Sequence, residues 1–556
     1  MVSSSRRAIT CTLLVLVAAV YLQAQTSAEK VVSGSISGKV TIKGKPAVRV
    51  LVIANDVREG RSSNTSRYRA RTDQAGSYRI TNLAAGTYEI STVTPALVPA
   101  NQLGPVVVSE GEQVEDVDVS LVPGGVITGK ITDSEGEPLI GQAVIITPLN
   151  IRFPSGFSTT LTTRLYIDNR TDDRGVYRAF GLPAGKYKVS VGDSGSGRRS
   201  SQEYYKETFY PSVSDAEKAT VIEVTEGSEA NNIDIVLGRP IGTFRVTGRL
   251  VDGETGRSVP NIRYSVRQTI KHDQQTIGSS SSTVGETNAN GEFRLENVTP
   301  GRYTIFTTPA TGSEMQAASL TVEVVDRDLT DLLIKTTKGS SLSGVVVLEG
   351  NERTPAMLSG LRIHAWVAGP ETRFGSSTSS AVGPDGTFSI NGVRSGLASF
   401  GVSSSGDNRN QFEVLRVERN GIPSETINVK EREHVAGIRV VVKYLKLTGA
   451  IRGQVKVENG ELPPVSRLSL WLWPLDENFE MKRTSSIESP KLDARGRFFA
   501  QRLPAGTYRV SVNVMAPDEE APGRTRIVEE KTQQVTVTDD TVTEVTLILK
   551  LQSNPN

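Results

Sequence analysis

Apolar and polar residues alternate over short stretches along the whole chain, and one such stretch returns five times. In its first copy, Tyr78 and Ile80 alternate with polar neighbours, and Tyr88 and Ile90 restart the alternation after a turn. A period of two residues is typical of a β-strand with one buried face. Turn-forming Asp and Gly residues precede and separate the two strands. The pattern therefore predicts a β-hairpin in each copy.

The copies are spaced by roughly a hundred residues, about the length of one autonomous domain. They read DQAGSYRITNLAAGTYEIS from Asp73, DDRGVYRAFGLPAGKYKVS from Asp172, NANGEFRLENVTPGRYTIF from Asn288, GPDGTFSINGVRSGLASFG from Gly383 and DARGRFFAQRLPAGTYRVS from Asp493. Two glycines of each copy are expected at turns: Gly76 and Gly86, Gly175 and Gly185, Gly291 and Gly301, Gly386 and Gly396, and Gly496 and Gly506. A positive φ is expected for the second glycine of four copies, namely Gly86, Gly185, Gly301 and Gly506.

Further alternating stretches flank each hairpin and bring each unit to about seven strands. This count favours an all-β chain of five tandem Greek-key β-sandwiches of the transthyretin or immunoglobulin type, after a signal peptide. The expected units are the signal peptide over 1–28 and sandwiches over 31–122, 123–238, 239–337, 338–446 and 447–552. Short joints between the units restrict their reorientation. Units laid end to end would form a segmented rod on the order of 150 Å long, and a packed cluster is the other arrangement that the sequence leaves open.

A tyrosine recurs at one position of the motif. The spacing of Leu83, Gly86 and Tyr88 resembles the tyrosine corner of immunoglobulin-like sandwiches, in which a Tyr hydroxyl binds the chain upstream. Four copies keep this residue, as Tyr88, Tyr187, Tyr303 and Tyr508. The fourth copy has Ala398 there and Phe400 two residues later, so we expect its hairpin to be the least firmly tied.

The order of these motifs resembles a known family. G-x-[VIL]-x-[DG], then D-x-x-G-x-[YF], then L-P-A-G-x-Y-x-[VI], looks like the carboxypeptidase regulatory-like domain, a transthyretin-like sandwich related to Cna-B surface modules. The resemblance covers essentially the whole mature chain and recurs five times. It implies the fold and is nearly silent about function, because folds of this kind host many functions.

The amino terminus indicates export. Arg6 and Arg7 precede an apolar run over 13–20, and small residues follow as cleavage positions. We expect a cleaved signal peptide and a secreted, periplasmic or cell-surface protein; a retained anchor is the alternative. No other stretch approaches the roughly twenty apolar residues of a span, so no span is expected in the mature chain. Cleavage also removes Cys11, the sole cysteine.

Charge and motifs argue against nucleic-acid binding and catalysis. The net charge is +2 with both signs scattered along the chain, so no basic stripe is formed. His272, His364 and His434 are far apart in the sequence, and none belongs to a zinc motif. No G-x-S-x-G motif occurs, and paired carboxylates fall in predicted turns. We therefore expect no catalytic residue, no metal site, no cofactor and no nucleic-acid partner.

Two tryptophans form a candidate ligand platform. In the segment over 468–473 the leucines share one strand face, and Trp471 and Trp473 share the other. Two indoles about seven Å apart would suit stacking on adjacent sugar rings. A central strand covered on both faces would instead bury both indoles as core. The core interpretation is favoured from the sequence.

An insertion in the second unit carries a candidate partner patch. Four aromatic residues lie close together in it: Tyr204, Tyr205, Phe209 and Tyr210. So many aromatic side chains are rarely left in solvent. We expect the insertion to fold as a flap over the end of its own sandwich, with a partner-binding surface as the alternative.

Together these features predict a non-enzymatic, exported scaffold or adhesion-type protein. Its expected partner is an envelope or extracellular protein or a glycan. The alternative is a carbohydrate-binding protein with a starch-binding-like fold, and exposure of Trp471 and Trp473 would favour that alternative.

Overall fold

The computed structural model describes most of the chain after the amino-terminal segment. The described residues are 33–57, 68–101, 103–149, 170–192, 204–272, 275–278, 282–350, 358–368, 376–404, 411–461, 467–476, 480, 489–517 and 525–550. The signal peptide predicted over 1–28 lies outside them. Among the described residues, no helix is long and apolar enough to cross a membrane.

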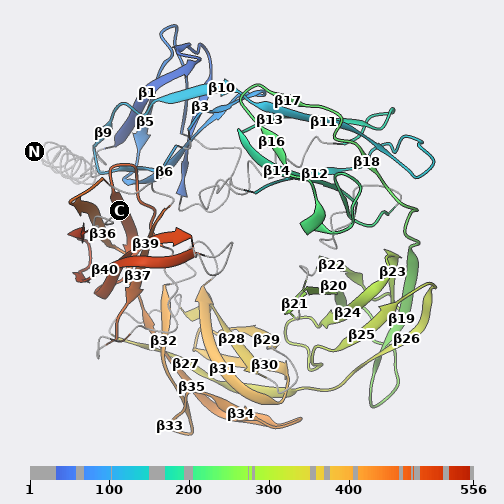
Figure 1. The fold of residues 1–556 in the computed structure, drawn as a ribbon. Helices are drawn as coiled ribbons and strands as arrows, with labels where there is room; N and C mark the ends of the chain where they lie inside the picture. Colours follow the sequence, from blue (N-terminus) through green and yellow to red (C-terminus); the bar gives the residue numbers. More distant parts are fainter. Residues whose placement is uncertain are drawn as a thin grey trace, which may run out of the picture.

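The fold is all-β, and the strands form five tandem sandwiches, as the alternation predicts (Figure 1). The first sandwich contains β1 (Gly34–Ile42), β2 (Lys45–Pro46), β3 (Leu51–Asp56), β4 (Arg69–Arg71), β5 (Ser77–Leu83), β6 (Gly86–Val93), β7 (Leu97–Pro99), β8 (Val106–Val108), β9 (Gln113–Val114) and β10 (Val119–Pro123). The second contains β11 (Gly125–Thr132), β12 (Val144–Pro148), β13 (Val176–Leu182), β14 (Gly185–Val191), β15 (Thr208–Phe209), β16 (Ile222–Val224), β17 (Glu229–Ala230) and β18 (Ile235–Val236).

The other three sandwiches follow the same order of strands. The third contains β19 (Phe244–Asp252), β20 (Arg263–His272), β21 (Gln275–Gly278), β22 (Ser282–Glu286), β23 (Glu292–Val298), β24 (Gly301–Thr308), β25 (Ser319–Val324) and β26 (Leu329–Thr336). The fourth contains β27 (Ser340–Glu349), β28 (Leu361–Ala368), β29 (Ser376–Ala381), β30 (Thr387–Val393), β31 (Gly396–Ser404), β32 (Phe412–Arg419), β33 (Ile422–Pro423), β34 (Ile427–Val429) and β35 (His434–Tyr444). The fifth contains β36 (Gly449–Glu458), β37 (Leu468–Pro474), β38 (Arg497–Leu503), β39 (Gly506–Pro517), β40 (Thr525–Val537) and β41 (Val542–Lys550).

Each sandwich has the same pairing scheme. Its opening strand pairs antiparallel with the first strand of the recurring motif and parallel with a closing strand, as in β36 with β38 and β41. The second strand of the motif lies in the other sheet, as in β39 between β37 and β40. The predicted hairpin is therefore wrong. The two strands of the motif belong to different sheets, and the turn between them crosses from one sheet to the other.

This crossing explains the spacing of the motif. The residue before the inward Leu or Val has a left-handed backbone in all five copies, at Asn82, Gly181, Asn297, Gly392 and Arg502. The register of the first sheet shifts by one residue beside it in every copy, which marks a β-bulge. A bulge bends a strand and increases its twist. It thus directs the chain over the edge of the sandwich into the opposite sheet.

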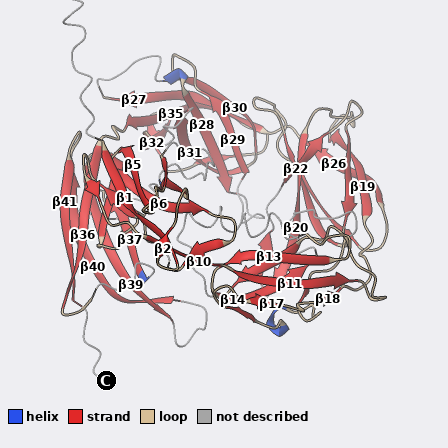
Figure 2. Cartoon of the chain, turned by 90° about the horizontal axis from the view of Figure 1, so that it is seen from above, coloured by secondary structure: helices blue, strands red, loops and turns tan. Residues whose placement is uncertain are grey.

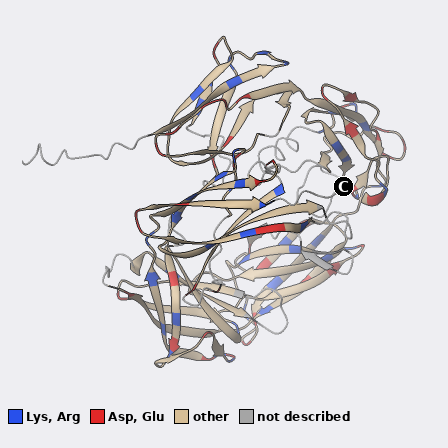
Figure 3. Cartoon of the chain, turned by 60° about the vertical axis from the view of Figure 1, so that its left-hand side comes forward, with Lys and Arg blue, Asp and Glu red and all other residues tan. Residues whose placement is uncertain are grey.

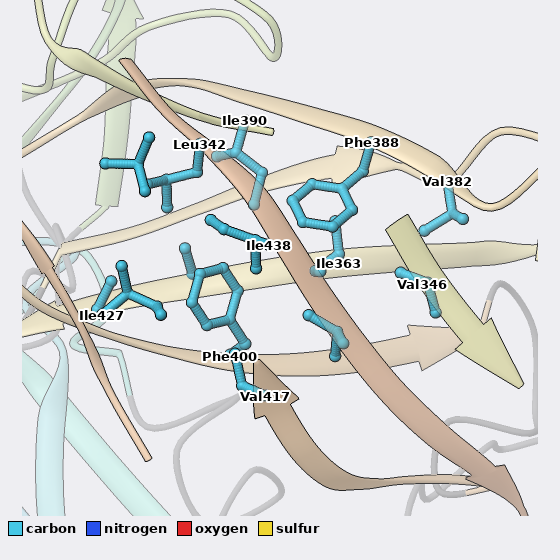
Figure 4. Packing of buried hydrophobic residues seen from close by; sticks show 14 of the residues in the cluster. Leu342, Val346, Ile363, Val382, Phe388, Ile390, Phe400, Val417, Ile427 and Ile438 are labelled. Carbon is cyan, nitrogen blue, oxygen red and sulfur yellow. The ribbon is translucent and has the colours of Figure 1, made fainter. Parts of the chain in front are cut away.

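Apolar side chains from the two sheets fill a separate core in each sandwich. Figure 4 shows the core of the fourth, where Phe400 packs among branched residues such as Ile363 and Val417. Ala398 is completely buried at the position that the corner tyrosines occupy elsewhere. Phe400 thus contributes an aromatic ring to a core that lacks the corner tyrosine.

The five sandwiches close into a ring (Figure 1), and the first lies beside the fifth (Figures 1 and 2). The segmented rod, one of the two arrangements that the sequence leaves open, is therefore wrong. The sheet that contains β6, β14, β20, β28 or β39 lies nearer the centre of the ring, and the sheet with the opening strand lies farther out. The two charge signs are scattered over all five sandwiches (Figure 3).

Candidate functional site

The contact between the first and fifth sandwiches closes the ring. Strand β38 packs against β6 and β8. The Arg497 guanidinium donates to the Val107 carbonyl oxygen at 2.7 Å, and the Gln501 amide donates to the Ala85 carbonyl oxygen at 2.7 Å. Val107 also forms a small apolar cluster with Phe499 and with Ala450. Hydrogen bonds to backbone carbonyls and an apolar centre together fasten the two sandwiches.

Ion pairs surround this apolar centre. The Lys491 ammonium lies 2.5 Å from a Glu89 carboxylate oxygen, and both side chains are largely buried. Arg497 lies 2.6 Å from Glu112 and 3.1 Å from Asp493. Two pairs that join the sandwiches, Lys491 with Glu89 and Arg497 with Glu112, bring together residues 402 and 385 positions apart, so they exist only when the ring is closed.

Burial and pairing shift the pKa values of these groups. Burial raises the pKa of the Asp493 carboxyl, and its hydrogen bonds from Arg497 only partly oppose this effect. Burial also acts to raise the pKa of Glu112, but hydrogen bonds from Arg497 and from the Ser109 amide outweigh it and leave that pKa below its usual value. Glu112 is therefore ionised and bound to Arg497 at neutral pH.

The sequence held one signal for this contact. The segment Phe498–Phe499–Ala500 breaks the alternation, and all three residues are buried. Phe498 and Ala500 point into the core of the fifth sandwich, and Phe499 packs on Val107. An apolar run in place of alternation is typical of a strand covered on both faces. The covering surface, however, belongs to a distant part of the chain, which periodicity does not reveal.

The tryptophan pair lies on the outer face of the fifth sandwich. Leu470 and Leu472 belong to the core, whereas the Trp471 side chain is 41% exposed and Trp473 is half-buried. The two ring centroids are 5.9 Å apart and the ring planes differ by 12°. The expectation that both indoles are core is therefore wrong. Its premise fails because only the leucine face of β37 packs on the core, and the opposite face, with Trp471, is left exposed.

Polar side chains flank the indoles on this face. Opposed residues of neighbouring strands share a sheet face, so Ser511 and Thr532 lie in the row of Trp471. The next row contains Ser469 and Asn513. Asn513 is only 7% exposed, and its side-chain oxygen has no hydrogen-bond partner among the described residues. The face therefore combines flat aromatic rings with hydroxyl and amide groups and, in the rows of Trp473 and Ser469, with the charged Arg509 and Glu530. It includes one buried acceptor that a ligand donor would satisfy.

The aromatic residues of the second sandwich pack partly on its core. Tyr205 is buried in the core, and Tyr210 packs against the same cluster. Phe209 lies in β15, which pairs with β14, and Tyr204 forms a bridge with Ile241. Tyr205, Phe209 and Tyr210 thus lie on their own sandwich, whereas Tyr204 pairs with the first residues of the third unit. A partner-binding role of these residues stays a prediction.

The turn and corner residues have structural positions. The first glycine of each copy has a left-handed backbone, with φ from 71° to 86° at Gly76, Gly175, Gly291, Gly386 and Gly496. The sequence predicts a positive φ for the second glycine of the motif. This prediction is wrong for Gly86 and Gly185, whereas Gly301 and Gly506 have positive φ values of 154° and 156°. A positive φ in that part of the motif instead recurs at the residue before the inward Leu or Val.

The corner tyrosines each bind four residues upstream. The hydroxyl groups of Tyr88, Tyr187 and Tyr508 donate to the carbonyl oxygens of Ala84, Pro183 and Pro504 at 2.8, 2.6 and 2.8 Å. The Tyr303 hydroxyl lies 2.8 Å from the Thr299 hydroxyl instead. The rings are buried, which raises the pKa of Tyr187 and of Tyr508. These residues hold the turn that crosses between the sheets.

The histidines do not come together. His364 lies in the fourth sandwich on β28, and His434 begins β35 of the same sandwich, where its ring lies 2.6 Å from the Ser341 hydroxyl. His272 ends β20 in the third sandwich. Within the described ranges, no group of three or more His, Cys, Asp or Glu side chains could hold a metal ion.

No family model matches the chain, and no curated protein matches it. Among solved structures, the chain is similar to a streptococcal ancillary pilin, with 11% identity, a TM-score of 0.23, and coverage of 55% of this chain and 99% of that chain. It is also similar to GBS52, the minor pilin of Streptococcus agalactiae, with 14% identity, a TM-score of 0.22, and coverage of 38% and 96%. The Bacillus anthracis TIE protein has 11% identity, a TM-score of 0.15, and coverage of 95% and 76%. TM-scores this low do not establish a shared overall fold.

Proposed function

We propose that the chain is a non-enzymatic, exported scaffold of the adhesion type, built from carboxypeptidase regulatory-like sandwiches. The observation that carries this proposal is the closing contact between the first and fifth sandwiches. Tandem domains move relative to one another by default unless contacts between them prevent it. A chain whose first and fifth sandwiches are fastened to each other instead holds its five sandwiches in fixed relative positions, as a scaffold requires.

Cross-linking in intact cells tests the scaffold function. The expected result is a mature amino terminus between residues 25 and 29, with cross-links from the ring to a small set of envelope or extracellular components. A chain that keeps Met1 and is recovered with the cytoplasmic proteins would contradict the proposal. Mass spectrometry of the native protein reports both the terminus and the cross-linked peptides.

Carbohydrate binding is a second candidate function, and the exposed pair Trp471 and Trp473 favours it. Flat indoles supply the apolar face on which a sugar ring stacks, and the neighbouring Ser511 and Asn513 supply hydrogen-bonding groups. Ligand sites combine apolar surface with a few placed polar groups in this way. Both functions are compatible, because a scaffold that binds glycans is also an adhesion protein.

Intrinsic fluorescence tests the carbohydrate function. The full chain is titrated with soluble neutral polysaccharides, namely an α-glucan, a β-glucan, a xylan and a mannan. At least one is expected to shift the tryptophan emission, and Trp471→Ala should weaken binding without unfolding the fifth sandwich. Because Trp471 lies outside the core, the variant should destabilise that sandwich by less than the about 3–5 kcal/mol expected for a buried Trp. Absence of binding to all four polymers would contradict this function.

A further inference from the structure

The fourth sandwich carries a second aromatic pair at the strand positions that Trp471 and Trp473 occupy in the fifth. The corner position aligns the two strands, because Pro474 lies opposite Tyr508 and Val367 lies opposite Ala398. His364 then corresponds to Trp471, and Trp366 corresponds to Trp473. The ring centroids of His364 and Trp366 are 5.7 Å apart with planes at 17°, close to the values for the tryptophan pair.

These two faces hold all three tryptophans of the chain. The Trp366 side chain is 45% exposed, slightly more than Trp471. Tryptophan is highly buried on average in folded proteins. Its placement on the outer faces of two equivalent strands, and nowhere else in the chain, is therefore unexpected for a residue that serves only packing.

The Trp366 indole lies against the sheet. A Cβ atom added to Gly401 would lie 2.5 Å from two carbon atoms of the six-membered ring of Trp366, Cζ3 and Cη2. Gly401 is the cross-strand neighbour of His364 on β31. The missing side chain thus lets the indole extend over the neighbouring strand while the residue stays 45% exposed. A ring held in this way binds with little loss of conformational entropy.

Hydroxyl groups surround this second pair as well. Ser377 and Ser399 lie opposite Trp366 on the two neighbouring strands, and Ser379 lies opposite His364. The His364 ring lies 2.7 Å from the Ser403 hydroxyl. Hydroxyl groups surround the two aromatic rings, so the surface is not a continuous apolar patch. Protein–protein interfaces usually have an apolar centre. This surface therefore suits a polyhydroxylated ligand better than a protein partner.

The imidazole is suited to stacking on a neutral ligand. Burial, together with the charge of Arg362, lowers the pKa of His364 below its usual value. The ring is therefore uncharged at neutral pH. The Arg362 guanidinium donates a hydrogen bond to the Ser379 hydroxyl at 3.1 Å.

We propose that the outer face of β28 and β31, centred on His364 and Trp366, is a second platform for a neutral polysaccharide, and that one long chain binds to the fourth and fifth sandwiches together. The proposal rests on the carbohydrate function proposed above. Both platforms lie on the sheets nearer the centre of the ring, in consecutive sandwiches (Figure 1). Occupation of the second platform by the same chain is then intramolecular, which raises the overall affinity without any new contact.

The test compares long and short ligands on the full chain. Affinity electrophoresis measures retention by the soluble polysaccharide that binds best, and calorimetry measures the stoichiometry of its hexasaccharide. For the polysaccharide, Trp366→Ala and Trp471→Ala are each expected to weaken binding ten-fold or more, and the double variant should abolish it. For the hexasaccharide, the stoichiometry should fall from two to one in each single variant.

Two further variants separate the platform from general effects of substitution. Gly401→Val keeps the indole but displaces it, so it should reproduce the loss seen with Trp366→Ala. Phe180→Ala removes an exposed aromatic side chain from the first sheet of the second sandwich and should leave binding unchanged. Circular dichroism of every variant checks that the sandwiches remain folded.

The outcomes distinguish this inference from the function on which it rests. If Trp366→Ala and Gly401→Val keep wild-type retention and stoichiometry while Trp471→Ala loses binding, the second platform is wrong and the carbohydrate function stands. If both single variants lose one hexasaccharide site but retention of the polysaccharide falls only two-fold, the two platforms do not share one chain. If the wild-type chain binds none of the polysaccharides, both proposals are wrong.

Discussion

Lys491 of the fifth sandwich pairs with Glu89 of the first across a sequence separation of 402 residues. Both side chains are largely withdrawn from solvent, with exposed fractions of 16% and 10%. Removal of one partner from such a pair leaves an uncompensated buried charge. Replacement of either residue should therefore destabilise the contact that closes the ring.

Charge reversal at this pair should open and restore the ring. Glu89→Lys places two ammonium groups together and should expose the amides of β38 and β8 to exchange, because the closing contact is lost. The double variant Glu89→Lys with Lys491→Glu should recover much of the protection. Hydrogen-exchange mass spectrometry measures both. Equal protection in the wild-type and single-variant chains would show that the two sandwiches do not depend on this pair.

The closing contact should weaken in acid. The pKa of Glu112 is below its usual value in the folded chain, so its contribution to stability is present above the usual pKa of about 4.3 and is lost as pH falls through the lowered value. The same exchange experiment from pH 6 to pH 3 should show ring opening in the acid range. Glu112→Gln removes this component of the pH dependence and is the matched control; an identical pH profile in that variant would contradict the assignment.

The linkers should differ in their sensitivity to proteases. The Gly124 amide donates to Ala96, the Gly339 amide donates to Glu314, and both glycines are packed closely against neighbouring backbone. Gly238 is exposed, and a Cβ atom there would meet no atom within 4 Å. Limited proteolysis should therefore cut near Gly238 first, since cleavage requires accessible backbone. Earlier cleavage at Gly124 or Gly339, identified by fragment masses, would contradict this order.

The corner hydroxyl should stabilise its sandwich. Tyr508→Phe removes the hydrogen bond to the Pro504 carbonyl oxygen and should cost the fifth sandwich about 1–1.5 kcal/mol. Tyr444→Phe changes a half-buried tyrosine of the fourth sandwich and is the control. Hydrogen exchange of β39 peptides measures the difference in stability. Unchanged protection in Tyr508→Phe would show that the corner hydrogen bond does not stabilise the sandwich.

Left-handed backbone at the bulge should matter most where a second sandwich lies close. Gly392 has φ of 69°, and an added Cβ atom would lie 2.4 Å from the Met315 carbonyl oxygen of the third sandwich. Gly136 has a similar backbone with open space around it. Both substitutions cause backbone strain of about 1–3 kcal/mol, but only Gly392→Ala also causes a steric clash. Gly392→Ala should therefore lower the melting temperature more than Gly136→Ala. Equal losses would contradict the close approach.

The sequence predicts what local periodicity determines. Alternation around Tyr78 and Tyr88 indicates strands and their buried faces, and the repeat indicates tandem sandwiches. It does not show which strands pair, so the turn at Gly86 is read as a hairpin although it crosses between sheets. The exposure of Trp471 depends on whether another part of the chain packs on the outer face of β37, and the burial of Phe499 depends on Val107 of the first sandwich. Both are determined by tertiary contacts between distant segments.

Small-angle X-ray scattering of the intact mature chain tests the closed ring most directly. Five sandwiches of roughly 30 Å each around a closed circuit give a radius of gyration of about 30 Å, whereas the same sandwiches end to end give about 43 Å. The closed ring predicts the smaller value for the wild-type chain and a larger one for Glu89→Lys. A wild-type value above about 40 Å, unchanged in the variant, would contradict the ring.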